Sequence, residues 1–214
     1  IDVIREQGGE FIEIDYESFD EAARLLYDGP WIAERSVAVM QMLGVDSRQL
    51  DPCVRSIVER GNELGATDAF AAFYRLRELK QRIEQQWQAF DVLITPTTPT
   101  IYSIDAMLAD PIQLNANLGY YTNFVNLFDL SAIAVPGRWR DDGLPSGFTL
   151  CAPAFAESGL TRLAAELHPL MVDTAGATAL PLPSPLEYQQ TVGSEPQQIE
   201  IMVCGAHMSA LPLN

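Results

Sequence analysis

The clearest hydrophobic pattern in this sequence lies between residues 67 and 89. Apolar side chains recur there at steps of three and four, with arginines and glutamates opposite, at Phe70, Phe73, Leu76, Leu79, Ile83 and Trp87, with Phe90 just beyond. Because an α-helix repeats every 3.6 residues, this spacing predicts one long amphipathic helix. Thr67 is the expected N-cap, and Lys80 is expected to pair with Glu84 on the solvated face. The apolar stripe predicts a core face or a dimer surface.

Three short, continuous apolar runs follow this helix, at residues 91–95, 131–136 and 146–151. Such runs, bounded by turn residues, are typical of strands that are buried on both faces. An amphipathic helix is expected at residues 157–172, and the alternating residues 11–15 predict a further short strand. Helices combined with buried strands predict a layered α/β fold.

Two capping motifs mark helix starts in the first third of the chain. Ser18, followed three residues later by Glu21, is a capping-box pattern for a helix that runs to about residue 26. The pair Asp51-Pro52 predicts a second start, because aspartate caps a helix and proline suits its first turn. That helix is expected to end at Gly61.

Residues 26–35, LYDGPWIAER, form a turn that leads into another predicted helix. Pro30 favours a helix start, which places a helix over residues 30–43 with Gly44 as its C-terminal cap. On that helix the neighbours of Arg35 at three and four residues are all apolar. Its guanidinium must therefore find a partner through tertiary contact or a ligand. Spacing alone favours a tertiary salt bridge.

The charge balance limits the classes of partner. The 214 residues carry a formal net charge of −16 at pH 7, with only 13 lysines and arginines. No basic stripe is present, so a nucleic-acid partner is not expected. A field of this sign also repels small anions, so an anionic ligand needs a locally placed cation.

Cysteine usage and hydropathy indicate a cytoplasmic protein. The three cysteines, Cys53, Cys151 and Cys204, are odd in number and far apart, which favours reduced thiols over a disulfide framework or a zinc set. No apolar run reaches the roughly 20 residues of a membrane helix, and no membrane partner is expected. Residue 1 is Ile rather than Met, so the lack of a targeting segment carries little weight.

The end of the chain changes in character. Residues 173–198 are rich in Pro, Ala, Thr, Ser and Gln and predict an extended linker. Residues 199–204 then predict a new strand. We therefore expect one domain at residues 1–172, a linker at 173–198, and the start of a truncated second domain at 199–214.

Three stretches together resemble the amidase signature family: DVLITPTTP at residues 91–99, YTNFVNLFDLSAIAVP at 121–136, and DGLPSGFTL at 142–150. The resemblance covers residues 11–172. It implies the C-terminal half of an α/β/α domain with a mixed sheet covered by helices, truncated at its N-terminus.

The motif LYDGPWIAER resembles the allophanate hydrolase branch of that family, as does the tail at residues 201–214. In that branch the Tyr and Arg of the motif bind the substrate carboxylate, which implies this role for Tyr27 and Arg35. The resemblance thus reverses the preference for a structural salt bridge at Arg35. The implied substrate is a small anionic amide, and the implied full-length protein is a homodimer.

The catalytic groups of the family are not matched. In the family, the serine nucleophile and a second serine lie in a Gly/Ser-rich signature, and the lysine base lies upstream of that signature. This sequence contains no Gly/Ser-rich run. We therefore assign no catalytic residue here and expect nucleophile and lysine upstream of residue 1. No cofactor and no metal are implied. The chain alone is expected to be inactive towards amides.

Two other interpretations stay open. One is another amidase-signature enzyme, such as a general amidase or a glutaminyl-tRNA amidotransferase subunit, which has no reason to carry Tyr27 with Arg35. The other is a non-catalytic binding or scaffold module. The sequence immediately upstream of residue 1 would distinguish the two enzyme interpretations from the non-catalytic module, since a Gly/Ser-rich signature there argues for an enzyme.

Overall fold

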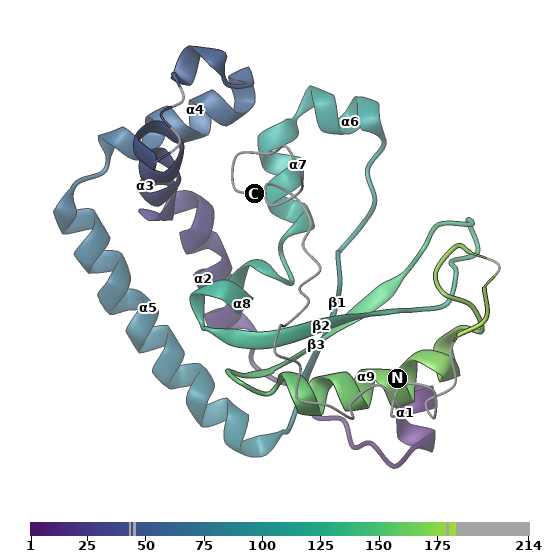
Figure 1. Ribbon diagram of the computed structural model, residues 1–214. Coiled ribbons are helices and arrows are strands. Elements are labelled where there is room, and N and C mark those ends of the chain that lie inside the picture. The colour runs from purple at the N-terminus through teal and green to yellow at the C-terminus, as the bar shows by residue number, and fades with distance from the viewer. Residues whose placement is uncertain (43, 45, 179, 183–214) are drawn as a thin grey trace, which may run out of the picture.

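The computed structural model describes residues 1–42, 44, 46–178 and 180–182. Its sheet has the strand order β1-β3-β2 and is formed by β1 (Leu93–Pro96), β2 (Leu130–Pro136) and β3 (Gly147–Pro153). Helices lie on both sides of this sheet (Figure 1). The predicted α/β class is confirmed. The described strands pair only antiparallel, so the mixed sheet stays an implication of the resemblance.

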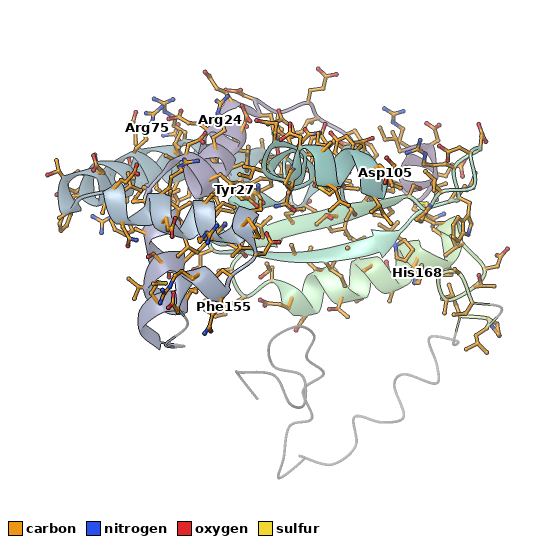
Figure 2. The ribbon with its side chains drawn as sticks, turned by 90° about the horizontal axis from the view of Figure 1, so that it is seen from above. Arg24, Tyr27, Arg75, Asp105, Phe155 and His168 are labelled. Carbon is orange, nitrogen blue, oxygen red and sulfur yellow. The ribbon has the colours of Figure 1, made fainter. Side chains whose placement is uncertain are left out.

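The two faces of the sheet carry separate cores, because neighbouring side chains on a strand point in opposite directions. Cys151 packs with one helical layer and the adjacent Leu150 with the other. The first layer consists of α2 (Glu17–Asp28), α5 (Ala66–Gln86) and α8 (Asn123–Leu127), and the second of α1 (Asp2–Glu6) and α9 (Glu157–Met171). Figure 2 shows the strands between α9, which carries His168, and α2, which carries Arg24 and Tyr27.

The remaining helical segments lie beside the first layer or join the elements. They are α3 (Trp31–Ser36), the π-helical segment η1 (Val37–Met42), α4 (Pro52–Arg60), α6 (Ile104–Ala109), α7 (Pro111–Leu118), and the 3₁₀ turns η2 (Ser47–Gln49), η3 (Gly61–Glu63) and η4 (Trp87–Ala89). Asp51 caps α4 as predicted, since its Oδ1 accepts a hydrogen bond from the Cys53 backbone N–H at 2.8 Å.

The long helix is confirmed as α5, but its apolar stripe is only partly buried. Leu79 and Ile83 are fully buried, whereas Phe70 and Phe73 are 61% and 50% exposed. The helix is capped at Gly65, whose N–H donates to the Asp68 carboxylate, and not at Thr67. The expected pair of Lys80 with Glu84 is not formed among the described residues; Arg75, Arg82 and Glu78 make the ion pairs within this helix.

Two local predictions near the N-terminus are wrong. Residues 11–15 form no strand, because no neighbouring strand pairs with them in the described chain; Ile14 instead packs against the core that includes Phe19 of α2. Ser18 is no cap, because α2 begins at Glu17 and buries the Ser18 side chain. The Glu21 carboxylate of the predicted capping box is held by Arg75 of α5 instead.

This Arg75–Glu21 contact is a bidentate ion pair that joins α2 to α5. Both guanidinium–carboxylate distances are 2.5 Å, and Arg75 also binds Glu78 at 2.6 Å. The hydrogen bonds from Arg75 hold the pKa of the Glu21 carboxyl below its usual range. A carboxyl whose pKa falls on folding stabilises the folded state above its unfolded pKa, and this stabilisation is lost as the pH falls through the folded pKa.

We therefore expect Glu21→Gln to lower the free energy of unfolding by about 0.5–1 kcal/mol near neutral pH, a range typical of half-exposed ion pairs. The difference from the wild type should vanish once the pH lies below both pKa values of Glu21. Urea unfolding over a series of pH values measures this. Glu166→Gln is the matched control, because Glu166 is exposed on α9 and makes no ion pair within the described chain. A pH-independent difference would contradict the assignment.

The end of the chain lies mostly outside the described residues. The strand expected at residues 199–204 and most of the linker expected at 173–198 fall on residues that the structure does not describe. The domain boundaries therefore stay predictions. Of the helices that are described, none has both the length and the apolar character needed to cross a membrane.

Candidate functional site

A cavity of about 490 Å³ opens between α2, α4, α7 and the start of α8. Its wall combines apolar side chains with an unusual number of polar ones: Asp20, Ala23, Arg24, Tyr27 and Asp28 of α2, Ile57 and Arg60 of α4, Ile112, Gln113, Ala116 and Asn117 of α7, and Tyr120 and Asn123. A cavity of this volume, lined by polar groups from several elements, suits a small polar ligand.

Tyr27, which the sequence picks out, lines this cavity, and Arg35, the other residue of the motif, lies over the Tyr27 ring without lining the cavity itself. Tyr27 lines it from the last turn of α2, while Arg35 projects from α3. The Arg35 guanidinium carbon lies over the Tyr27 ring, 5.0 Å from its centroid. Within the described part of the chain, no carboxylate lies within 4.0 Å of Arg35. The guanidinium therefore stacks on the ring, and its hydrogen-bonding fork has no carboxylate partner among the described residues.

The sharp corner between α2 and α3 creates this juxtaposition. Gly29 follows α2 in an extended conformation, where a Cβ atom would lie 2.4 Å from the Leu25 carbonyl oxygen. Glycine is therefore required for close approach rather than for a positive φ. Pro30 is the N-cap of α3, so the helix begins at Trp31, one residue later than predicted. The seven residues between Tyr27 and Arg35 thus fold back on themselves.

Helix α3 packs against α4 and η3. Ser36, directly after Arg35, is buried and donates a hydrogen bond from Oγ to Asn62 Oδ1 at 2.9 Å. Gly61 packs so closely that a Cβ atom there would lie 2.6 Å from the Ile32 carbonyl oxygen. The helix that carries Arg35 therefore has little freedom to shift.

Aromatic side chains pack next to the cavity wall. The Tyr16 hydroxyl donates to the Tyr120 carbonyl oxygen at 3.1 Å, and the Tyr16 ring stacks on Phe19 at 5.6 Å. Burial raises the pKa of Tyr16 and, to a smaller degree, that of Tyr120. Both hydroxyls are therefore neutral hydrogen-bonding groups near physiological pH.

The threonines at the end of the first buried run do not line this cavity. Thr95 and Thr149 are buried partners on β1 and β3, and Thr149 shares a hydrogen bond with Thr97 at 3.1 Å. Thr98 donates to the Leu118 carbonyl oxygen at 3.3 Å. These hydroxyls join the sheet to the loop after β1, which is a structural role.

Residues 1–161 match the amidase family. The chain belongs to this family. Urea amidolyase from Saccharomyces cerevisiae is 37% identical over 218 residues, which cover 97% of this chain and 12% of the yeast protein. A glutamyl-tRNA(Gln) amidotransferase protein from Corynebacterium glutamicum is 27% identical over 78% of this chain and 39% of its own length.

Among solved structures of the amidase family, allophanate hydrolase from Kluyveromyces lactis resembles this fold with a TM-score of 0.79 and 30% sequence identity. The match covers 99% of this chain and 36% of that chain. Urea amidolyase from the same yeast gives a TM-score of 0.77 over 99% of this chain and 13% of its own. The chain thus spans less than two fifths of the length of each of these relatives.

Sequence reasoning missed most of the cavity wall of this amidase-family chain. Arg24, Arg60, Asn117 and Asn123 come from α2, α4, α7 and α8, and no spacing rule links them. Asn117 is hydrogen-bonded to the Tyr102 hydroxyl, and the Asn123 side chain occupies the space that a Cβ atom at Gly119 would take. Only tertiary packing brings these groups together, so the sequence carried no signal for them.

Proposed function

We propose that this chain provides the substrate-carboxylate clamp of an allophanate hydrolase, an amidase that converts allophanate to ammonia and carbon dioxide in the use of urea nitrogen. The observation that carries the proposal is the Arg35 guanidinium over the ring of Tyr27, which lines the cavity, with no carboxylate partner for Arg35 among the residues described. The two yeast relatives named urea amidolyase and allophanate hydrolase support it.

The chemistry of allophanate fits this pair. The substrate is a small ureido carboxylate, and a guanidinium fork holds a carboxylate through two parallel hydrogen bonds. Each charge-assisted bond contributes about 1.5–3 kcal/mol. The Tyr27 hydroxyl supplies a further donor. The amide side chains of Asn117 and Asn123 on the facing wall complement the donors and acceptors of the ureido group.

The proposal assigns binding, and not bond cleavage, to these residues. The sequence holds no Gly/Ser-rich run that could carry the nucleophile of the family, and Lys80 lies in α5, outside the cavity lining. We therefore infer that the chain alone does not hydrolyse amides. The groups that attack the amide carbonyl are expected in the full-length protein.

Ammonia release by the full-length protein tests this function. Allophanate should be hydrolysed in preference to acetamide and glutamine, neither of which offers a carboxylate beside the amide at the same spacing. The 27% identical amidotransferase protein makes a glutamine-dependent activity the alternative. Preference for glutamine would favour that alternative, and no hydrolysis of any of the three amides would favour a non-catalytic module.

We further propose that the full-length protein is a homodimer that uses the exposed aromatic side chains of α5. Phe70, Phe73 and Tyr74 are 61%, 50% and 64% exposed, and the Phe73 ring lies 5.6 Å from that of Trp31. Grouped exposed rings of this kind are typical of protein–protein contacts.

The double substitution of Phe70 and Phe73 by serine should therefore convert the dimer to a monomer, as measured by light scattering after size exclusion. Phe155→Ser is the control, because Phe155 is 94% exposed but follows β3, outside this group. A dimer that survives the double substitution, or one that Phe155→Ser also dissociates, would place the interface elsewhere.

A further inference from the structure

A second cation lines the same cavity as Tyr27. Arg60 is the last residue of α4, and its Nη2 donates a long hydrogen bond of 3.5 Å to the Tyr27 carbonyl oxygen. Among the residues that the structure describes, no carboxylate lies within 4.0 Å of it. The other cavity arginine, Arg24, is already paired with Asp20 at 3.1 Å. Arg60 is thus the unpaired cation of the described cavity wall.

The charge balance of the cavity depends on Arg60. Two carboxylates, Asp20 and Asp28, and two guanidiniums, Arg24 and Arg60, line the wall, so its formal charge is zero. The whole protein carries −16. The cavity is therefore a neutral region on a strongly negative surface. Loss of Arg60 would leave it with one negative charge and would repel an anion at short range.

Arg35 and Arg60 differ in their positions relative to the cavity. Arg35 lies over the Tyr27 ring and is not part of the cavity wall, whereas Arg60 lines the cavity directly. A carboxylate that enters would meet Arg60 and Tyr27 without any movement of Arg35 from its stacked position. Arg60 is therefore positioned to bind the entering anion first. Arg35 would bind it after leaving its stacked position on the Tyr27 ring.

We propose that Arg60 is a second carboxylate-binding residue of this site, acting with Tyr27 and Arg35. This inference rests on the proposed function for the identity of the ligand. The competing role for Arg60 is purely structural, since a cation at the C-terminus of α2 satisfies a free carbonyl oxygen and interacts favourably with the helix dipole. The two roles differ in one respect. Capping requires only a hydrogen-bond donor, while carboxylate binding requires the charge.

Substitutions at position 60 separate these roles in the full-length protein. Arg60→Gln keeps an N–H donor for the Tyr27 carbonyl and removes the charge, and Arg60→Lys keeps both. The probes are malonamate, in which a methylene replaces the inner N–H of allophanate, and its neutral amide malonamide. Calorimetric titration gives both dissociation constants. Arg55→Gln is the control, because Arg55 lies on the same helix outside the cavity wall.

We expect Arg60→Gln to weaken malonamate binding about tenfold, which is the scale of one charge-assisted contact, and to leave malonamide unchanged. Arg60→Lys should stay within about threefold of the wild type, because point charge and donor remain. Arg55→Gln should bind both probes normally. The salt dependence of malonamate binding should also decrease in Arg60→Gln.

Three outcomes would overturn the inference: unchanged malonamate binding in Arg60→Gln, equal weakening for both probes, or equal weakening by Arg55→Gln. A wild type that binds no malonamate would do so as well. The proposed function is tested separately, because the titrations require no turnover. It would fail if the full-length protein did not hydrolyse allophanate.

Discussion

The substitution Arg35→Lys in the full-length protein is expected to lower kcat/KM for allophanate about 100-fold, because lysine keeps the charge but loses the planar fork that we propose holds two carboxylate oxygens. The loss should appear mainly in KM, since the carboxylate is bound alike in the ground state and the transition state. Steady-state ammonia release measures both constants.

Arg162→Lys is the matched control for this experiment. Arg162 is exposed on α9, across the sheet from the cavity, and has no carboxylate within 4.0 Å in the described structure. Its substitution should leave both constants unchanged. If Arg35→Lys also retained the kcat/KM of the wild type for allophanate, Arg35 would not clamp the carboxylate.

The second large effect is expected from Gly61→Ala, which acts on the same site through the backbone. The new Cβ atom would lie 2.6 Å from the Ile32 carbonyl oxygen and 2.9 Å from the Ala33 Cα. Because both are backbone atoms, α3 must move away from α4. We expect the free energy of unfolding to fall by about 1–3 kcal/mol, as for other overpacked sites. Malonamate binding should weaken as well, because α3 carries Arg35.

Gly159→Ala distinguishes this clash from a general effect of replacing glycine. Gly159 lies within α9, and a Cβ atom there meets nothing within 4 Å. Alanine at this position should stabilise the protein by about 0.4–1 kcal/mol, because it restricts the unfolded chain. Urea unfolding of both variants measures the contrast. Equal stability of Gly61→Ala and the wild type would mean that α3 and α4 do not pack as described.

The parts of the fold that local patterns could predict are those with strong periodicity or a short-range capping motif. The helix at α5 follows from the spacing of apolar residues, and the positions of the three strands follow from the continuous apolar runs, although β2 is not buried on both faces, since Ala132 and Ala134 are exposed. Asp51-Pro52 marks the start of α4, because the cap bonds span only two residues. In each case the interactions that decide the structure are close in sequence.

Two of the predictions that failed depend on partners far away in sequence. Residues 11–15 alternate like a strand but have no strand to pair with among the described residues. The Glu21 carboxylate binds Arg75, 54 residues away, instead of capping its own helix. Prediction of the cavity is limited in the same way. The sequence motif indicated Tyr27 and Arg35, whereas only tertiary packing places Arg60 and Asn117 in the wall.

A crystal structure of the full-length protein with bound malonamate tests the central claim most directly. We predict the ligand carboxylate in the cavity, with one oxygen pair facing the Arg35 guanidinium and a hydrogen bond from the Tyr27 hydroxyl. A malonamate carboxylate bound away from both residues, with the Arg35 guanidinium still stacked on the Tyr27 ring, would contradict it.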